Sequence, residues 1–254
     1  IMTNKLKYFV GNWKMFGDFS SIKIINQINQ FCSNFKKKGI KSKVIVCVPH
    51  TLIYPFVTKL KNKLVTIGAQ NCHHHNGVGA FTGSINSSMI RKSGARYIIL
   101  GHSENRSSGD TNKLINKKID ASLREKLNVI FCIGENLHHK REGKTFSVLR
   151  KQINSSIDKK FNLNRIIIAY EPIWSIGTGK VPKTNELIKI FKFIKDEYKR
   201  NFKLKRFPIV LYGGSVNDTN IQQFSLIPEI DGFLIGGASQ SSKKFIDIIK
   251  NYYK

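Results

Sequence analysis

The stretch "RYIILGHSE" at residues 96–104 decides the fold together with two segments that follow it, "TNKLINKKIDASLREK" at 111–126 and "NVIFCIG" at 128–134. The first and last segments open as short β-branched and aromatic runs, which are typical of buried strands. The middle segment has apolar residues three and four positions apart, which predicts a helix. A strand, a helix and a second strand in this order form the unit of a parallel sheet.

The same unit recurs along the chain. Further strand-like runs are "YFVGNW" at 8–13, "KVIVCV" at 43–48, "VTIGAQ" at 65–70, "IIIAY" at 166–170, "IVLYGG" at 209–214 and "DGFLIGG" at 231–237. Helical patterns are predicted from Ser20, from Tyr54, at 86–94, at 145–160, at 184–200, near Ile221 and at 243–253. The strand runs are almost continuously apolar, as expected when both faces of a parallel sheet are covered.

Eight such units predict an α/β fold, a closed (β/α)8 barrel with eight parallel strands surrounded by helices. The chain has 254 residues, 41% of them hydrophobic, and no repeat or Pro/Ser-rich linker, so we expect a single domain over residues 1–254. A doubly wound open sheet is the structural rival. It normally carries a GxGxxG loop after its first strand, and "GNWKMFGDFS" at 11–20 is no such loop.

Composition favours a cytoplasmic protein without membrane partners. The chain has no 18-residue apolar run, and "IMTNKLKYFV" at 1–10 lacks the apolar stretch and cleavage site of a secretory signal. The four cysteines, Cys32, Cys47, Cys72 and Cys132, are scattered without CxxC spacing, so neither a disulfide framework nor a zinc site is expected. The histidines at 73–75 and 138–139 have no cysteine or carboxylate at ligand spacing, so no metal site is expected there either.

The net charge of +27 raises nucleic acid or an anionic membrane surface as a partner. However, the basic residues are spread along the whole chain, with "FKKKG" at 35–39 the densest run, and no RNA-recognition signature, zinc finger or basic heptad occurs. Coding bias with a solvated basic surface is the simpler interpretation, and steering of an anionic substrate is the alternative.

Polar residues and glycines follow several predicted strands, where the active site of this architecture lies. These residues are Asn12, Lys14, His102, Ser103, Glu104, Glu171, Gly213, Gly214, Gly236 and Gly237. Singly, each has an ordinary structural explanation. Together, an acid, an imidazole and an ammonium suit proton transfer next to a carbonyl, and glycine N–H groups can hold a phosphate. The residues therefore predict an enzyme acting on a small phosphorylated carbonyl compound.

The acid Glu171 belongs to a segment of its own, "YEPIWSIGTGK" at 170–180, which has no second charge before Lys180. The segment fits either a plain surface connection or a moving lid.

Seven motifs resemble the triosephosphate isomerase family in its order and spacing. They are "GNWKM" at 11–15, "GAFTG" at 79–83, "GHSE" at 101–104, "CIGE" at 132–135, "YEPIW" with "IGTGK" at 170–180, "YGGSV" at 212–216 and "DGFLIGGAS" at 231–239. The resemblance implies interconversion of dihydroxyacetone phosphate and D-glyceraldehyde 3-phosphate, in glycolysis and gluconeogenesis, by general acid-base catalysis. It also implies that no metal or organic cofactor is needed and that the protein is a homodimer.

Carried over by position, the resemblance implies catalytic roles for three residues. Glu171 is the base that moves a proton between two carbons, and His102 is a neutral imidazole that polarises the carbonyl, as known for this family. Lys14 stabilises the enediolate and the phosphate. Asn12 orients Lys14, and Glu104 holds Lys14 in place.

The resemblance also implies a phosphate grip, a lid and a dimer loop. The backbone N–H groups of Gly177, Ser215 and Gly237 bind the phosphate, and Gly236 lets the chain approach it closely. Residues 172–174 form a stiff hinge, and residues 175–179, "SIGTG", form a lid that closes over the substrate. Thr82 lies at the tip of a loop that inserts into the neighbouring subunit.

The chain departs from the family pattern at five positions. Phe16 replaces an Asn, Ser175 replaces an Ala, and Pro182 falls at the far hinge of the lid, where its fixed φ could restrict motion. Ser84 and Asn105 replace a Glu and an Arg that form an ion pair across the family's dimer interface. Because both charges are gone, neither is left unpaired, and a weaker dimer is expected.

The sequence leaves two other functions possible. A barrel aldolase or sugar-phosphate epimerase would need a Schiff-base lysine deep in the barrel or metal ligands at strand ends, and the sequence predicts neither. A nucleic-acid-binding barrel with secondary or lost catalysis would show sequence-specific binding without isomerase activity.

Overall fold

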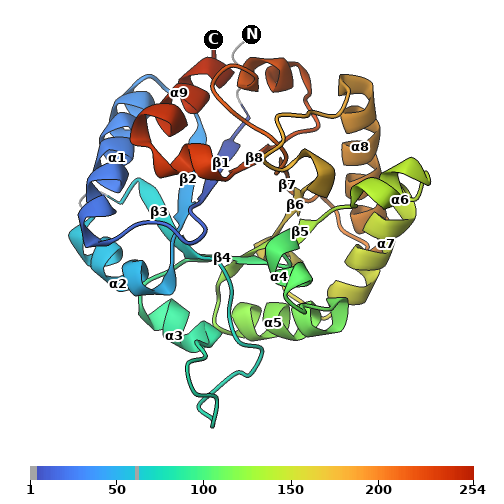
Figure 1. Cartoon of the computed structure of the whole chain (residues 1–254), viewed down its shortest axis with the longest axis horizontal. Helices are drawn as coiled ribbons and strands as arrows, with labels where there is room; N and C mark the ends of the chain where they lie inside the picture. Colours follow the sequence, from blue (N-terminus) through green and yellow to red (C-terminus); the bar gives the residue numbers. More distant parts are fainter. Residues whose placement is uncertain (1–4, 61–62) are drawn as a thin grey trace.

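Eight parallel strands form a closed barrel in the computed structural model, which describes residues 5–60 and 63–254. The strands pair in chain order, and β8 pairs back to β1 (Figure 1). They are β1 Lys7–Asn12, β2 Ser42–Cys47, β3 Val65–Ala69, β4 Tyr97–Leu100, β5 Asn128–Ile133, β6 Ile166–Tyr170, β7 Val210–Tyr212 and β8 Gly232–Ile235. The predicted (β/α)8 barrel is confirmed.

Helices surround the barrel on its outside (Figure 1). The α-helices are α1 Ile22–Lys37, α2 His50–Lys59, α3 Ser87–Lys92, α4 Ser103–Ser107, α5 Asn112–Arg124, α6 Leu137–Arg141, α7 Thr145–Ser156, α8 Thr184–Asn201 and α9 Ser242–Tyr252. The 3-10 helices are η1 Phe19–Ser21, η2 Leu163–Arg165, η3 Ile173–Ser175, η4 Ile221–Leu226 and η5 Gly237–Gln240.

One predicted helix start was wrong, and two short helices were not predicted. Helix α2 begins at His50 rather than Tyr54, because Leu52 and Ile53 are buried against the core and bring the first turn into the helix. The short helices α4 and α6 were not predicted, since neither is long enough to show helical periodicity. Helix α4 begins directly after His102, one of the candidate site residues.

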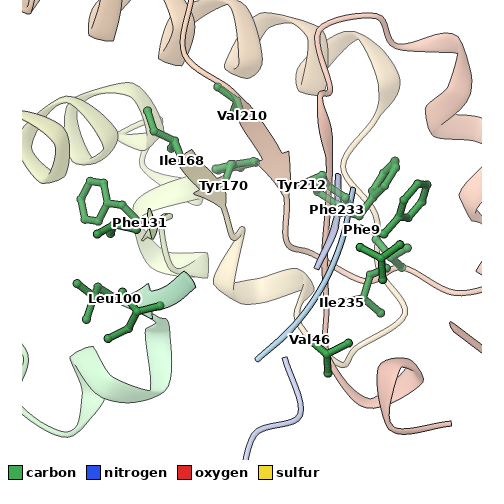
Figure 2. Packing of buried hydrophobic residues seen from close by; sticks show 14 of the residues in the cluster. Phe9, Val46, Leu100, Phe131, Ile168, Tyr170, Val210, Tyr212, Phe233 and Ile235 are labelled. Carbon is green, nitrogen blue, oxygen red and sulfur yellow. The ribbon is translucent and has the colours of Figure 1, made fainter. Parts of the chain in front are cut away.

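The strands bury side chains on both faces, which explains their continuous apolar runs. One cluster fills the inside of the barrel and contains Val10, Ile45, Cys47, Ile99, Ile130, Cys132, Ile167, Ala169, Leu211 and Leu234. The alternating residues form a larger cluster between the strands and the helices. In Figure 2, Phe9 and Phe233 from the paired strands β1 and β8 lie side by side, with ring centroids 5.8 Å apart.

The barrel leaves one long connection, residues 70–86 between β3 and α3, projecting from its rim (Figure 1). Within the described residues, none of the helices combines the length and the apolar character needed to cross a membrane. The segment 1–10, in which no export signal is predicted, includes residues 1–4, which lie outside the described residues. The single domain over residues 1–254 includes these positions and stays a prediction.

Candidate active site

A pocket of about 230 Å³ opens at the carboxyl ends of the strands. Ten of the predicted site residues line it, namely Asn12, Lys14, His102, Glu171, Gly177, Gly213, Gly214, Ser215, Gly236 and Gly237. Ser103, Glu104 and Thr82 do not. Glu104 reaches the site through its contact with Lys14, and Thr82 is exposed on the long loop 70–86.

Glu171 and His102 lie side by side in the pocket. Glu171 follows β6 and is 3% exposed, His102 follows β4 and is 5% exposed, and Glu171 Oε1 lies 3.3 Å from His102 Nε2. The backbone of Glu171 is fixed by donation of its N–H to the Ile133 carbonyl at 2.7 Å. Gly134 permits this approach, since a Cβ there would lie 1.8 Å from the Glu171 carbonyl oxygen.

Burial raises the pKa of Glu171 above its ordinary value. The nearby His102 ring, the Cys132 thiol, the Ser103 N–H and the Lys14 charge oppose this rise but do not cancel it. A buried carboxylate with a raised pKa is a stronger base than an ordinary glutamate, which suits removal of a proton from carbon.

The ring of His102 is held in one tautomer. His102 caps helix α4, and its Nδ1 accepts the backbone N–H of Glu104 at 3.2 Å. Because a backbone amide can only donate, Nδ1 carries no proton in this arrangement. The proton of the neutral ring is therefore on Nε2, which faces Glu171 and the pocket.

Lys14 is held in an uncommon backbone conformation. Its φ is +55°, in the left-handed region that non-glycine residues rarely occupy. The Asn12 side-chain oxygen accepts the Lys14 N–H at 3.1 Å and supports this turn. At the other end of the side chain, Lys14 Nζ lies 2.6 Å from Glu104 Oε1. The predicted contacts of Asn12 and Glu104 with Lys14 are both present, and backbone strain of this kind is typical of functional sites.

Glu104 and Lys14 interact as a charged pair at the rim. Partial burial alone would raise the pKa of Glu104, but the hydrogen bond from Lys14, the nearby His102 ring and the charge of Lys14 lower it overall. Glu104 therefore stays ionised and keeps the ammonium of Lys14 directed along the edge of the pocket.

The glycine-rich wall of the pocket offers backbone N–H groups. Gly237 is the first residue of η5, so its N–H has no acceptor within that helix. A Cβ at Gly177 or Gly237 would contact nothing within 4 Å, so both positions face open space. At Gly236 a Cβ would lie at an ordinary 3.7 Å from Lys14 Cε, so no protein atom requires a glycine there. The predicted close approach of Gly236 to a phosphate stays a prediction.

Two contacts of Trp174, which lies in the segment predicted as a hinge, were not predicted from the sequence. Trp174 Nε1 donates to Glu135 Oε1 at 2.8 Å, and Lys140 Nζ lies 3.8 Å from the centre of the Trp174 ring. Glu135 also accepts the Tyr170 hydroxyl at 3.2 Å and is fully buried. Glu135 belongs to the "CIGE" motif, so a charged residue two positions after a buried strand was the signal available.

Arg106 is a second residue that the sequence did not single out. Its guanidinium donates to the carbonyls of Gly101 and Cys132, at 2.7 and 3.2 Å, and to Asn112 Oδ1 at 2.7 Å. These bonds tie the ends of β4 and β5 together under the Glu171 and His102 pair. A cation so close after "GHSE" was the only local hint of this role.

The residues that depart from the family pattern differ in their packing and exposure. Phe16 packs edge-on against Trp13, with centroids 5.5 Å apart, so it adds to the core below the first loop. Ser84 is exposed and Asn105 is half-buried. Pro182 is buried beyond residues 175–179, and its effect on motion of this predicted lid stays a prediction.

Comparisons with known proteins agree with this geometry. The family model described as triosephosphate isomerase matches residues 7–252. A triosephosphate isomerase from Carboxydothermus hydrogenoformans is 34% identical, over 96% of this chain and 97% of the relative. Another, from Synechococcus sp., is 36% identical, over 94% of this chain and 92% of the relative.

A solved structure is similar throughout its length. The crystal structure of triosephosphate isomerase from Bartonella henselae superposes with a TM-score of 0.88 at 30% identity, covering 98% of this chain and 99% of that one. With a family match over residues 7–252 and relatives this similar over nearly their whole length, the chain belongs to the triosephosphate isomerase family.

Proposed function

We propose that Glu171 and His102 carry out the family's reaction in this pocket, the interconversion of dihydroxyacetone phosphate and D-glyceraldehyde 3-phosphate. One observation carries the proposal: the Glu171 carboxylate and the His102 Nε2 lie 3.3 Å apart in a pocket that several glycines also line. A base and a neutral donor are thus side by side where a carbonyl carbon and its oxygen would sit.

The reaction proceeds in four proton transfers, two at carbon by Glu171 and two at oxygen by His102. Glu171 takes a proton from C1 of dihydroxyacetone phosphate, and the electron pair of that C–H bond forms the double bond of an enediolate while charge moves to the C2 oxygen. His102 supplies the Nε2 proton to this oxygen and takes one from the C1 oxygen. Glu171 then returns its proton to C2, which gives the aldehyde at C1 and completes the isomerisation.

Charge that develops during the reaction needs stabilisation. The Lys14 ammonium, held by Glu104, lies at the edge of the pocket where it can attract both the enediolate and the phosphate dianion. We propose that the N–H groups of Gly177, Ser215 and Gly237 bind the phosphate oxygens beside Gly236, and that closure of the lid excludes water. The proposed chemistry uses no metal or organic cofactor.

Removing the ammonium tests this part of the proposal. Lys14→Met is expected to lower kcat/KM by about 10²-fold, the scale of losing one group that stabilises developing charge. A coupled isomerase assay measures the effect, and Lys113→Met, which removes an exposed lysine of α5, is the matched control for net charge. Equal activity of the two variants would contradict the role of Lys14.

We also propose that the protein works as a homodimer in the cytoplasm, without a nucleic-acid or membrane partner. Support for a covered surface comes from Met15, next to Lys14, which is fully exposed in the single chain, and from Phe81 on the long loop, which is 43% exposed. Large apolar side chains at such positions are typical of interaction sites.

The dimer should be sensitive to salt. Two chains of net charge +27 repel each other, and salt screens that repulsion, so sedimentation is expected to show tighter association at high ionic strength. The double variant Ser84→Glu with Asn105→Arg restores the charges usual in the family and should tighten the dimer at low salt. A tight dimer that does not respond to salt would contradict the expected weakening.

A further inference from the structure

The hydroxyl of Ser175 joins three parts of the site. Ser175 is fully buried at the start of the lid, and its Oγ donates to the carbonyl of Lys180, just past the lid, at 2.5 Å. The same oxygen lies 3.4 Å from the Tyr212 hydroxyl and accepts the backbone N–H of Ser215 at 3.3 Å. A serine hydroxyl has one proton and two lone pairs, so these partners fill its capacity, with Tyr212 as a donor.

The neighbouring backbone is shaped around this cluster. A Cβ at Gly214 would lie 2.2 Å from the Tyr212 hydroxyl oxygen and 2.8 Å from Ser175 Oγ, so any larger residue would push the two apart. The loop after β7 therefore accommodates the hydroxyl of Ser175 and aligns it with the Ser215 N–H.

This contact engages a group that the proposed phosphate grip requires. The Ser215 N–H faces Ser175 Oγ, whereas Gly237 lines the pocket and its N–H has no acceptor within its helix. A single N–H bonds fully to only one well-aligned acceptor. A phosphate oxygen must therefore compete with Ser175 for Ser215, but not for Gly237.

We propose that Ser175 is a positioning residue that lowers the affinity of the pocket for the substrate phosphate. Its hydroxyl holds the Ser215 N–H and ties the start of the lid to Lys180, and the incoming phosphate takes this N–H from Ser175. The inference rests on the proposed function, because it concerns the phosphate grip of that same site. An alanine at this position, as is usual in the family, offers no competing oxygen.

Phosphate binding to the full-length chain gives a direct test. Calorimetric titration with inorganic phosphate is expected to show binding about 2- to 10-fold tighter for Ser175→Ala than for the wild type, the scale of one net hydrogen bond. Ser175→Cys should behave in the same way, because a thiol fills the space but is a weak acceptor. KM for glyceraldehyde 3-phosphate should fall by a similar factor with a smaller change in kcat.

A matched variant controls for loss of a serine hydroxyl. Ser147 is exposed on α7, outside the pocket lining, and its Oγ donates to the Lys144 carbonyl at 2.8 Å, so Ser147→Ala is expected to leave the phosphate Kd within about 2-fold. The amide resonance of Ser215 in the phosphate-free protein should shift in Ser175→Ala and stay in place in Ser147→Ala.

The outcomes separate this inference from the proposed function. If the wild type isomerises and binds phosphate but both Ser175 variants bind it equally or more weakly, Ser175 is only structural and the inference is wrong. A lower unfolding midpoint without tighter phosphate binding leads to the same conclusion. If the wild type shows neither isomerase activity nor phosphate binding, the proposed function itself fails.

Discussion

Glu171→Gln is expected to lower isomerase turnover by about 10²-fold or more and to make the protein more stable at neutral pH. The activity falls because an amide cannot take the proton from carbon, and general base catalysis contributes about 10²- to 10⁴-fold. The glutamine keeps the shape of the side chain, so the variant should fold normally. Near-normal activity would overturn the assignment of Glu171 as the base.

The gain in stability follows from the raised pKa of Glu171. Burial makes the folded-state pKa higher than that of the unfolded chain, so the folded protein binds more protons in the window above the ordinary carboxyl pKa. The free energy of unfolding of the wild type therefore falls as pH rises through this window. A neutral glutamine at the same position does not ionise, so it does not lower the free energy of unfolding as pH rises.

Urea unfolding across pH 4 to 8 measures this difference. The midpoint of Glu171→Gln should exceed that of the wild type, and the gap should widen as pH rises before it levels off. Glu142→Gln is the control, because Glu142 is exposed and away from the pocket, and the salt bridges it makes to His138 and Lys144 lie at the surface. A gap that shrinks with rising pH would contradict the sign of the shift.

His102→Gln is the second substitution with a large expected effect, again about 10²-fold or more in turnover. Glutamine can accept the Glu104 N–H with its oxygen, so helix α4 should keep its cap. It cannot give up one proton and take another, which the transfer between the substrate oxygens requires. The coupled assay and an unfolding curve together show whether the loss is chemical.

His138→Gln is the matched control for this variant. His138 is exposed on α6 and contacts only Glu142 at 3.3 Å among the ion pairs of the described residues. Normal turnover is expected for His138→Gln. If His102→Gln were equally active, the assignment of the imidazole to proton transfer would be wrong.

Much of the fold could be predicted from local pattern. The continuous apolar strands and the periodic helices between them follow from burial on two faces of a parallel sheet, as Val10 inside the barrel and Phe9 outside it show. Helices α4 and α6 escaped prediction because five residues are too few to show a period. The start of α2 was misplaced because its first turn is decided by burial of Leu52 and Ile53.

Most of the candidate site could also be predicted from the sequence, because a parallel barrel brings the residues after its strands to one face. Positions 102 and 171 are far apart in the chain, yet the closed strand order places their side chains 3.3 Å apart. The sequence by itself thus determined the barrel and the types of residue at its carboxyl edge.

The contacts that these residues make with one another depend on the tertiary structure. The contact of Lys14 with Glu104 spans 90 residues, that of Trp174 with Glu135 spans 39, and that of Ser215 with Ser175 spans 40. Contacts between residues so far apart in the chain depend on strand register and on the course of separate loops, which no short stretch of sequence encodes. The tautomer of His102 and the engagement of the Ser215 N–H follow from those contacts, since a hydrogen bond requires both partners at a fixed distance and angle.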